Sequence, residues 1–325
     1  MTELPIAAAS REGGDSRAPR YALIFRTHFW DGFADRQFRR AAASAPGADL
    51  WVLVDETRGR VEGVPTNRVF RLTDGQILEA GYVAAGEGSI QWYSGDVPLY
   101  MFRAAHPDYD HYVQMEYDVN FHLDVDALVA RIARDGTDMV ALTKGEATDE
   151  WPWLDSCLDV YRPEEVRHQL ICIGAFSGRA LDVLARERLA QAQSLKAGAI
   201  RAWPYCEGFL ATEAAKQGLN TRELSDYGDV DAYDWWPPYV ETDLPRLQRF
   251  AFVHPVLDEK RYVPSLFKRP MLLGTLLSPR SWFGRKLRRL GPAGYLRALR
   301  TPEYRQMLRE LSRSRYVSFK EDRLG

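Results

Sequence analysis

The stretch His111-Tyr112-Val113-Gln114-Met115-Glu116-Tyr117-Asp118 joins an apolar run to two carboxylates separated by one residue. The aromatic and apolar residues at its start predict a buried strand of an α/β sheet. Side chains alternate in an extended chain, so Glu116 and Asp118 share one face and Tyr117 lies on the other. This arrangement suits a metal site or acid/base chemistry, and it equally suits a strand end that turns polar as it leaves the core.

Strands and helices alternate on both sides of this stretch. Residues 21–27 predict a strand, residues 31–43 a helix, and residues 49–55 a second strand that ends in an acid. Further strands are predicted over 67–71, 138–143, 169–177 and 249–253, and further helices over 98–105, 125–132, 178–195 and 203–217. The fold class is therefore α/β: a single Rossmann-like, mostly parallel mixed sheet flanked by helices, which binds ligands at the carboxyl ends of its strands. No GxGxxG or Walker glycine loop follows the first strand, which argues against a dinucleotide or P-loop site.

Composition limits the protein class. The 325 residues are 46% hydrophobic and 12% aromatic, enough for a sizeable core. The apolar runs are far shorter than the ~20 residues that span a bilayer. Three widely spaced cysteines argue against a disulfide framework and fit a reducing cytoplasm. Residues 1–20 lack the basic start and long apolar centre of a secretion signal, so we expect a disordered leader of an intracellular protein.

Charge is distributed unevenly along the chain. From Glu259 to the end, 17 Lys and Arg residues stand against 5 acids, which gives +12 there and −14 in the remainder. The basic part predicts an anionic partner. Nucleic acid is the third choice, behind a membrane surface and simple packing on the domain, because no recognised nucleic-acid-binding fold accompanies the charge.

The basic residues form part of a C-terminal extension, residues 263–325, that follows a catalytic domain over residues 21–262. Aromatic and leucine residues recur among its arginines at roughly helical spacing. This pattern is typical of an amphipathic helix lying on an anionic membrane at the inner face. In the alternative, Trp282, Leu287 and Leu290 pack on the domain and the arginines face solvent.

A carboxylate pair at one strand end and a histidine at another, His254, can assemble a divalent-metal site at the carboxyl edge of the sheet. Oxygen ligands suit Mg²⁺ or Mn²⁺, and an added imidazole favours Mn²⁺. Such an ion would offset the charge of a bound diphosphate and stabilise it as a leaving group. A purely structural role for His254 is the alternative.

Glu116-Tyr117-Asp118 resembles the acidic DxD-type motif of glycosyltransferases with the A-type (GT-A) fold, in its ExD variant. The segments Trp92-Tyr93-Ser94-Gly95-Asp96 and Phe252-Val253-His254-Pro255 are similar to that superfamily in order and spacing, over about residues 20–260. The motif is short and identifies no subfamily. Glutamate replaces the first aspartate, which leaves open whether Glu116 contacts metal, ribose or water.

The resemblance implies roles for individual residues. Asp118 and His254 would ligate the metal, and Glu116 would contact metal or nucleotide. Arg26 and Asp55, at the first two strand ends, would contact the nucleotide, with surface salt bridges as the alternative. Asp96 would face the nucleotide or cap the helix that follows it.

Glu207 is the candidate acceptor-side carboxylate. If the enzyme inverts the anomeric centre, this residue would take the proton from the attacking hydroxyl, and its position at a helix start would favour ionisation. Its alternative role is charge placement at the helix end. Five tryptophans lie in irregular segments, where their rings could stack on sugar rings or pack in the hydrophobic core: Trp151, Trp153, Trp203, Trp235 and Trp236.

These observations predict a metal-dependent glycosyltransferase that moves a sugar from a nucleotide-sugar donor to an acceptor hydroxyl. The basic extension points to a membrane-associated glycan or a lipid-linked polysaccharide precursor as acceptor. Two alternatives remain: a metal-dependent phosphoester or diphosphate hydrolase, and a non-catalytic peripheral membrane or carbohydrate-binding protein. Retention or inversion of configuration stays open.

Overall fold

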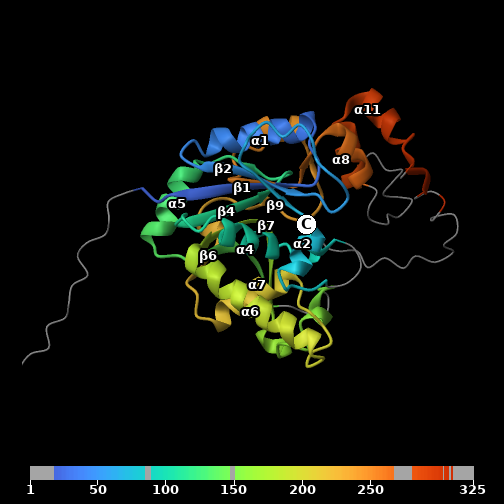
Figure 1. The fold of residues 1–325 in the computed structure, drawn as a ribbon. Coiled ribbons are helices and arrows are strands. Elements are labelled where there is room, and N and C mark those ends of the chain that lie inside the picture. The colour runs from blue at the N-terminus through green and yellow to red at the C-terminus, as the bar shows by residue number, and fades with distance from the viewer. Residues whose placement is uncertain are drawn as a thin grey trace, which may run out of the picture.

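The fold is built on a seven-stranded sheet in the order β3-β2-β1-β4-β7-β6-β8 (Figure 1). The computed structural model describes residues 18–84, 89–146, 151–266, 280–302, 304–306 and 309, so the predicted leader lies almost wholly outside the described residues. Only β7 runs antiparallel to its neighbours. The predicted mostly parallel mixed sheet is confirmed. The strands are β1 (Tyr21–Thr27), β2 (Asp49–Asp55), β3 (Val69–Leu72), β4 (His111–Glu116), β6 (Met139–Glu146), β7 (Arg167–Ser177) and β8 (Thr221–Glu223).

Both faces of the sheet are covered, because side chains of its central strands alternate between two apolar clusters. Along β1, Ala22 and Ile24 enter one cluster, while Leu23 and Phe25 enter the other. A strand buried on both faces reads as a continuous apolar run, which is what the sequence shows. Figure 1 shows α1 on one side of the sheet and α6 and α7 on the other. The first side carries α1 (Gly32–Ser44) and α5 (Val125–Arg134), and the second carries α4 (Val97–Ala105), α6 (Gly178–Lys196) and α7 (Cys206–Lys216).

Two short helices occupy the segment between β3 and α4, where no helix or strand was predicted. They are α2 (Asp74–Glu79) and α3 (Ile90–Tyr93). Thr73 accepts a hydrogen bond from the Gln76 amide, and the Gln76 side chain accepts one from the Thr73 amide. This capping box was legible in the sequence as Thr-x-x-Gln and was missed.

Two small sheets lie beside the large one. The first pairs β5 (Asn120–Phe121), β11 (Phe252–His254) and β9 (Ala232–Tyr233), and the second pairs β10 (Tyr239–Val240) with β12 (Val256–Leu257). The predicted strand over 249–253 is therefore shorter and shifted toward His254. This shift matters because β5 follows directly after the acidic motif, so its pairing with β11 brings His254 back to that motif.

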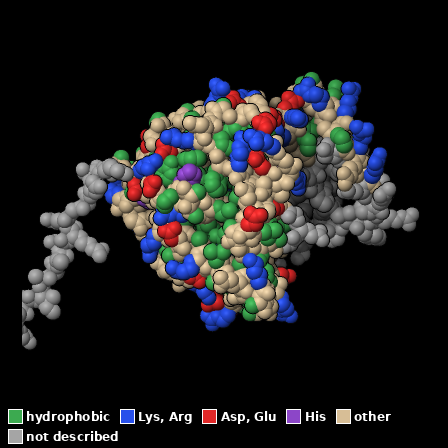
Figure 2. All heavy atoms as spheres, viewed as in Figure 1, with side chains coloured by type: hydrophobic (Ala, Val, Ile, Leu, Met, Phe, Trp, Pro, Cys, Tyr) green, Lys and Arg blue, Asp and Glu red, His purple; other side chains and the backbone are tan. Residues whose placement is uncertain are grey.

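The C-terminal extension packs on the domain. Its described helices are α8 (Glu259–Leu266), which crosses the predicted boundary at residue 262, α10 (Trp282–Arg288) and α11 (Gly291–Ala298). Phe283 and Leu287 of α10 are fully buried and share an apolar cluster with α8. Figure 2 shows Lys and Arg side chains on the outer surface of this region. Leu287 and Leu290 therefore pack on the domain as the packing alternative expected, while the side chain of Trp282 lies outside what the structure describes. None of the helices in the described part of the chain is long and apolar enough to cross a bilayer.

Candidate active site

The acidic motif lies where β4 ends, at the carboxyl edge of the parallel strands. Glu116 is the last residue of β4, and Asp118 is 8% exposed in the turn that follows. The Val256 amide donates a hydrogen bond of 2.7 Å to the Asp118 carbonyl. This bond fixes the turn against the chain segment that begins just after His254.

The imidazole of His254 is oriented by its backbone contact. Nδ1 lies 2.7 Å from the Asp234 carbonyl oxygen, which can only accept, so Nδ1 carries the proton and donates. Nε2 is then unprotonated and carries a lone pair, and this nitrogen lies 3.6 Å from Oδ1 of Asp118. Burial lowers the pKa of His254 even though the charge of Glu116 opposes the shift. A neutral imidazole with one nitrogen held by a carbonyl is the usual state of a metal-ligating histidine.

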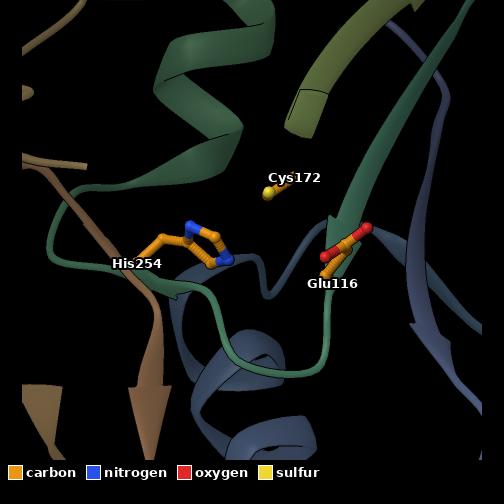
Figure 3. A group of neighbouring side chains, drawn as sticks. All are labelled: Glu116, Cys172 and His254. Carbon is orange, nitrogen blue, oxygen red and sulfur yellow. The ribbon is translucent and has the colours of Figure 1, made fainter. Parts of the chain in front are cut away.

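A third ligand type joins the cluster. One ligand atom each of Glu116, Cys172 and His254 lies within 4.8 Å of the others (Figure 3). Cys172 reaches this place because β7 is antiparallel to β4, with Met115 opposite Ile173, so the next pair along is Glu116 and Cys172. Directly opposed residues project from the same face of a sheet. Sequence reasoning missed Cys172, since no local pattern reveals which strand lies beside β4.

The electrostatics of the cluster favour a cation. Burial, and then the charge of Asp118, raise the pKa of Glu116. Burial and the charge of Glu116 raise the pKa of the Cys172 thiol well above its ordinary value. Two carboxylates that share a half-buried space repel each other, and a cation bound between them would offset that repulsion. The donor set therefore fits a divalent ion, with Glu116, Asp118 and His254 as the predicted ligands.

Glu207 lies in the first turn of α7, close enough to the cluster to be affected by its charge. Burial, and then the charge of Glu116, raise the pKa of Glu207 to about 7, while Lys144 acts in the opposite direction. The expectation that the helix start would favour ionisation is therefore wrong: desolvation and a neighbouring carboxylate outweigh the helix dipole. Lys144 also pairs at 3.3 Å with Asp234, the residue whose carbonyl oxygen orients His254.

Arg26 lies beside the motif and is engaged by the protein. Its guanidinium donates to the carbonyls of Gly95 (2.9 Å) and Gln91 (3.2 Å) and to the Gln114 side chain (3.1 Å). It is 9% exposed, so the surface salt bridge offered as its alternative is wrong. Arg26 pairs in register with Glu116 and its charge lowers the pKa of that carboxyl.

Asp55 ends β2 at the same edge of the sheet. Its carboxylate accepts hydrogen bonds from the Thr57 amide at 2.9 Å and the Ser89 hydroxyl at 3.2 Å. The described residues place no salt bridge on Asp55, so its predicted nucleotide contact stays a prediction.

Asp96 is not at the site. Its side chain is fully buried and forms a two-point ion pair with Arg188, with N–O distances of 2.7 and 3.2 Å. Asp96 occupies the N-cap position of α4 but its side chain makes no capping hydrogen bond. Both expected roles are therefore wrong, because the carboxylate is needed to compensate a buried guanidinium.

The tryptophans divide into core and surface residues. Trp151 and Trp203 are buried in the main core, as are Leu154 and Cys157. Trp151, Leu154 and Cys157 thus anchor the irregular segment between β6 and β7 in this core, while other residues of the segment are exposed. Trp235 is different: it is 53% exposed and follows Asp234, the residue that holds His254.

Comparisons with known proteins give structural likeness only. No protein-family model matches the sequence, and no curated protein matches it. Similar solved structures include apo mouse xyloside xylosyltransferase 1 (TM-score 0.41, 10% identity, covering 72% of this chain and 97% of that chain). They also include the galactosyltransferase LgtC with donor and acceptor sugar analogs (TM-score 0.40, 10% identity, 72% and 86% covered). A third is CMP:2-keto-3-deoxy-manno-octonic acid synthetase with CTP (TM-score 0.33, 13% identity, 63% and 89% covered). At these scores the likeness carries no weight for the activity, and the fold rests on the strand order described above.

Proposed function

We propose that the chain is a metal-dependent glycosyltransferase that moves a sugar from a nucleotide-sugar donor to an acceptor hydroxyl. One observation carries the proposal: Glu116, Asp118 and His254 converge at the carboxyl edge of a mostly parallel sheet, with the lone pair of His254 Nε2 facing Asp118. A divalent ion held there, Mn²⁺ or Mg²⁺, would offset the charge of the donor diphosphate and stabilise it as a leaving group. Asp55, at the end of β2 on the same edge of the sheet, would accept hydrogen bonds from the nucleotide.

Glu207 supports the acceptor half of this proposal. A general base works best when its pKa lies near the operating pH, and the pKa of Glu207 is about 7. In an inverting reaction this carboxylate would take the proton of the attacking hydroxyl. The exposed ring of Trp235 lies next along the chain from Asp234 and offers an apolar face of the kind that sugars stack on.

Calorimetric titration with nucleoside diphosphates, with and without Mn²⁺, tests the proposal. We expect one nucleoside diphosphate to bind at least about tenfold more tightly when Mn²⁺ is present, because the ion offsets charge between two carboxylates and a diphosphate. Binding that is unchanged by Mn²⁺ and Mg²⁺ for every common base would contradict the metal-dependent transferase.

Glu207→Gln separates catalysis from donor binding. Removing the base while keeping side-chain size should lower kcat by about 10²- to 10⁴-fold, and it should leave the affinity for the nucleoside diphosphate nearly unchanged. Transfer kinetics and the same titration supply both readouts. Glu164→Gln, at an exposed glutamate, is the matched control. A Glu207 variant that keeps most of its kcat would remove the base assignment.

The finer proposal concerns the acceptor, which would be a lipid-linked glycan precursor at an anionic membrane surface. The outward cations of the extension support it, among them the exposed Arg285 and Arg288, whereas the buried Phe283 and Leu287 cannot insert. Membrane contact would therefore be electrostatic and about 1 kcal/mol per nearby cation. Co-sedimentation with phosphatidylserine vesicles should fall steeply between low and high salt; equal sedimentation with neutral vesicles would contradict the proposal.

A further inference from the structure

The thiol of Cys172 belongs to the same cluster of donor atoms as the predicted oxygen and nitrogen ligands. Its sulfur, the carboxylate of Glu116 and the imidazole of His254 face one another in Figure 3, from three strands that are far apart in the sequence. His254 is 5% exposed, and its Nε2 is directed into this cluster because Nδ1 is held by the Asp234 carbonyl. The two observations are independent: one is a distance among donors, and the other is the tautomer of a buried ring.

The spacing of these donors suits a small four-coordinate ion. Metal–sulfur bonds of about 2.3 Å and metal–nitrogen or metal–oxygen bonds of about 2.0–2.2 Å place tetrahedral ligand atoms roughly 3.3–3.7 Å apart. The three donors already lie within 4.8 Å of one another, and Asp118 Oδ1 is 3.6 Å from His254 Nε2. Side-chain rotations that move the donor atoms by a few tenths of an ångström to about one ångström would bring them to the separations of a tetrahedral site, without movement of the strands.

The chemistry of a mixed sulfur, nitrogen and oxygen set differs from that of an all-oxygen set. Mg²⁺ takes oxygen ligands in near-ideal octahedral geometry and gains little from a thiolate. Zn²⁺ and Co²⁺ bind thiolate, imidazole and carboxylate together, and the order of intrinsic affinity places both above Mn²⁺. A thiol among the ligands therefore changes which ion the site prefers.

We propose that Cys172 is a metal ligand that makes this site prefer thiolate-binding divalent ions of the zinc class over Mg²⁺ and Mn²⁺. The proposal rests on the metal site of the proposed function and names the ion class that occupies it. On coordination the Cys172 S–H bond breaks heterolytically, its proton passes to solvent, and the sulfur lone pair forms the bond to the ion. No electron is transferred, and no further reactant is needed.

Titration of the full-length protein with Co²⁺ tests this assignment. A thiolate bound to Co²⁺ gives a ligand-to-metal charge-transfer band, which oxygen and nitrogen ligands do not give. We expect the band to saturate at one Co²⁺ per chain in the wild type and to be lost in Cys172→Ser. Cys157→Ser, at a fully buried cysteine outside the cluster, should keep the band. Thermal melts of both variants verify folding.

Competition with Mn²⁺ gives a second readout. Zn²⁺ should displace Mn²⁺ from the wild type, and Cys172→Ser should weaken Zn²⁺ binding by at least about tenfold while leaving Mn²⁺ affinity nearly unchanged. Bound Co²⁺ without the charge-transfer band, or a band that survives in a folded Cys172→Ser, overturns thiolate ligation and leaves the transferase proposal intact. Failure of both Co²⁺ and Mn²⁺ to bind overturns the metal site itself, and with it the proposed function.

Discussion

Asp118→Asn should abolish metal-dependent binding of the nucleoside diphosphate and reduce transfer to background. The substitution preserves shape but removes the charge that lies 3.6 Å from His254 Nε2. An amide is a poor ligand for a divalent ion compared with a carboxylate, so we expect Mn²⁺ affinity to fall by at least about a hundredfold. Titration calorimetry with Mn²⁺ and the nucleoside diphosphate measures the loss.

The same variant should not be less stable than the wild type. The charge of Asp118 raises the pKa of Glu116, which shows that the two carboxylates repel one another in the metal-free protein. Removing one charge relieves that repulsion, and the melting temperature should stay level or rise. Asp108→Asn is the control: it removes an equally charged, exposed group before β4, at the opposite edge of the sheet, and should change neither metal binding nor transfer.

Loss of function with a large drop in melting temperature would mean that Asp118 holds the fold together, and its assignment as a ligand would fail. The variant also distinguishes the alternative functions. A non-catalytic membrane protein would bind vesicles through its extension, and Asp118→Asn would leave that binding unchanged. A transferase would lose turnover while keeping its vesicle binding.

Asp96→Asn should produce the largest loss of stability, about 3–5 kcal/mol, because it leaves Arg188 charged and uncompensated in the core. Both side chains of this ion pair are fully buried. Arg188 also lies over the rings of Trp203 and Phe209 and donates to the Pro204 carbonyl at 2.7 Å. The pair thus connects the start of α4, the middle of α6 and the segment that leads into α7.

Chemical denaturation measures this loss, and two comparisons make it specific. The double variant Asp96→Leu with Arg188→Met removes both charges and should be less destabilised than Asp96→Asn, since no buried charge is stranded. Asp182→Asn, on the same helix as Arg188, breaks the pair with Arg103 of α4, where the carboxylate is 57% exposed, and should cost no more than about 1 kcal/mol. Equal losses in Asp96→Asn and Asp182→Asn would contradict the role of burial.

The Asp96–Arg188 ion pair also helps to position the candidate active site. Asp96 is followed by α4 and preceded by Gly95, whose carbonyl accepts from Arg26 beside Glu116. Arg188 holds Pro204, three residues before Glu207. A weakened ion pair should therefore displace the start of α7 and lower kcat more than it lowers metal affinity, which transfer kinetics and metal titration together would resolve.

Sequence patterns predicted most of the regular structure because those patterns are local. An apolar run bounded by polar residues specified β1, β2 and β4 nearly to the residue. Asp124 directly precedes the helix predicted over residues 125–132 and caps it, because its side chain accepts from the Ala127 amide at 3.1 Å. The misses in secondary structure were short helices such as α2 and α3 and short strands such as β5, β8 and β9, where a few residues carry too little periodicity to be recognised.

The sequence by itself determined the α/β class, the strand that ends in Glu116 and the presence of a second carboxylate two residues later, although Asp118 lies in the turn after the strand and not on one of its faces. Only the tertiary structure decided what surrounds them. The backbone bond from Val256 to Asp118 brought His254 to the motif, and the antiparallel course of β7 brought Cys172 there. Burial and the field of Glu116, rather than the helix dipole, raised the pKa of Glu207. Which strands lie side by side, and which side chains are buried, depends on contacts between residues far apart in the chain. A short stretch of sequence therefore cannot specify either.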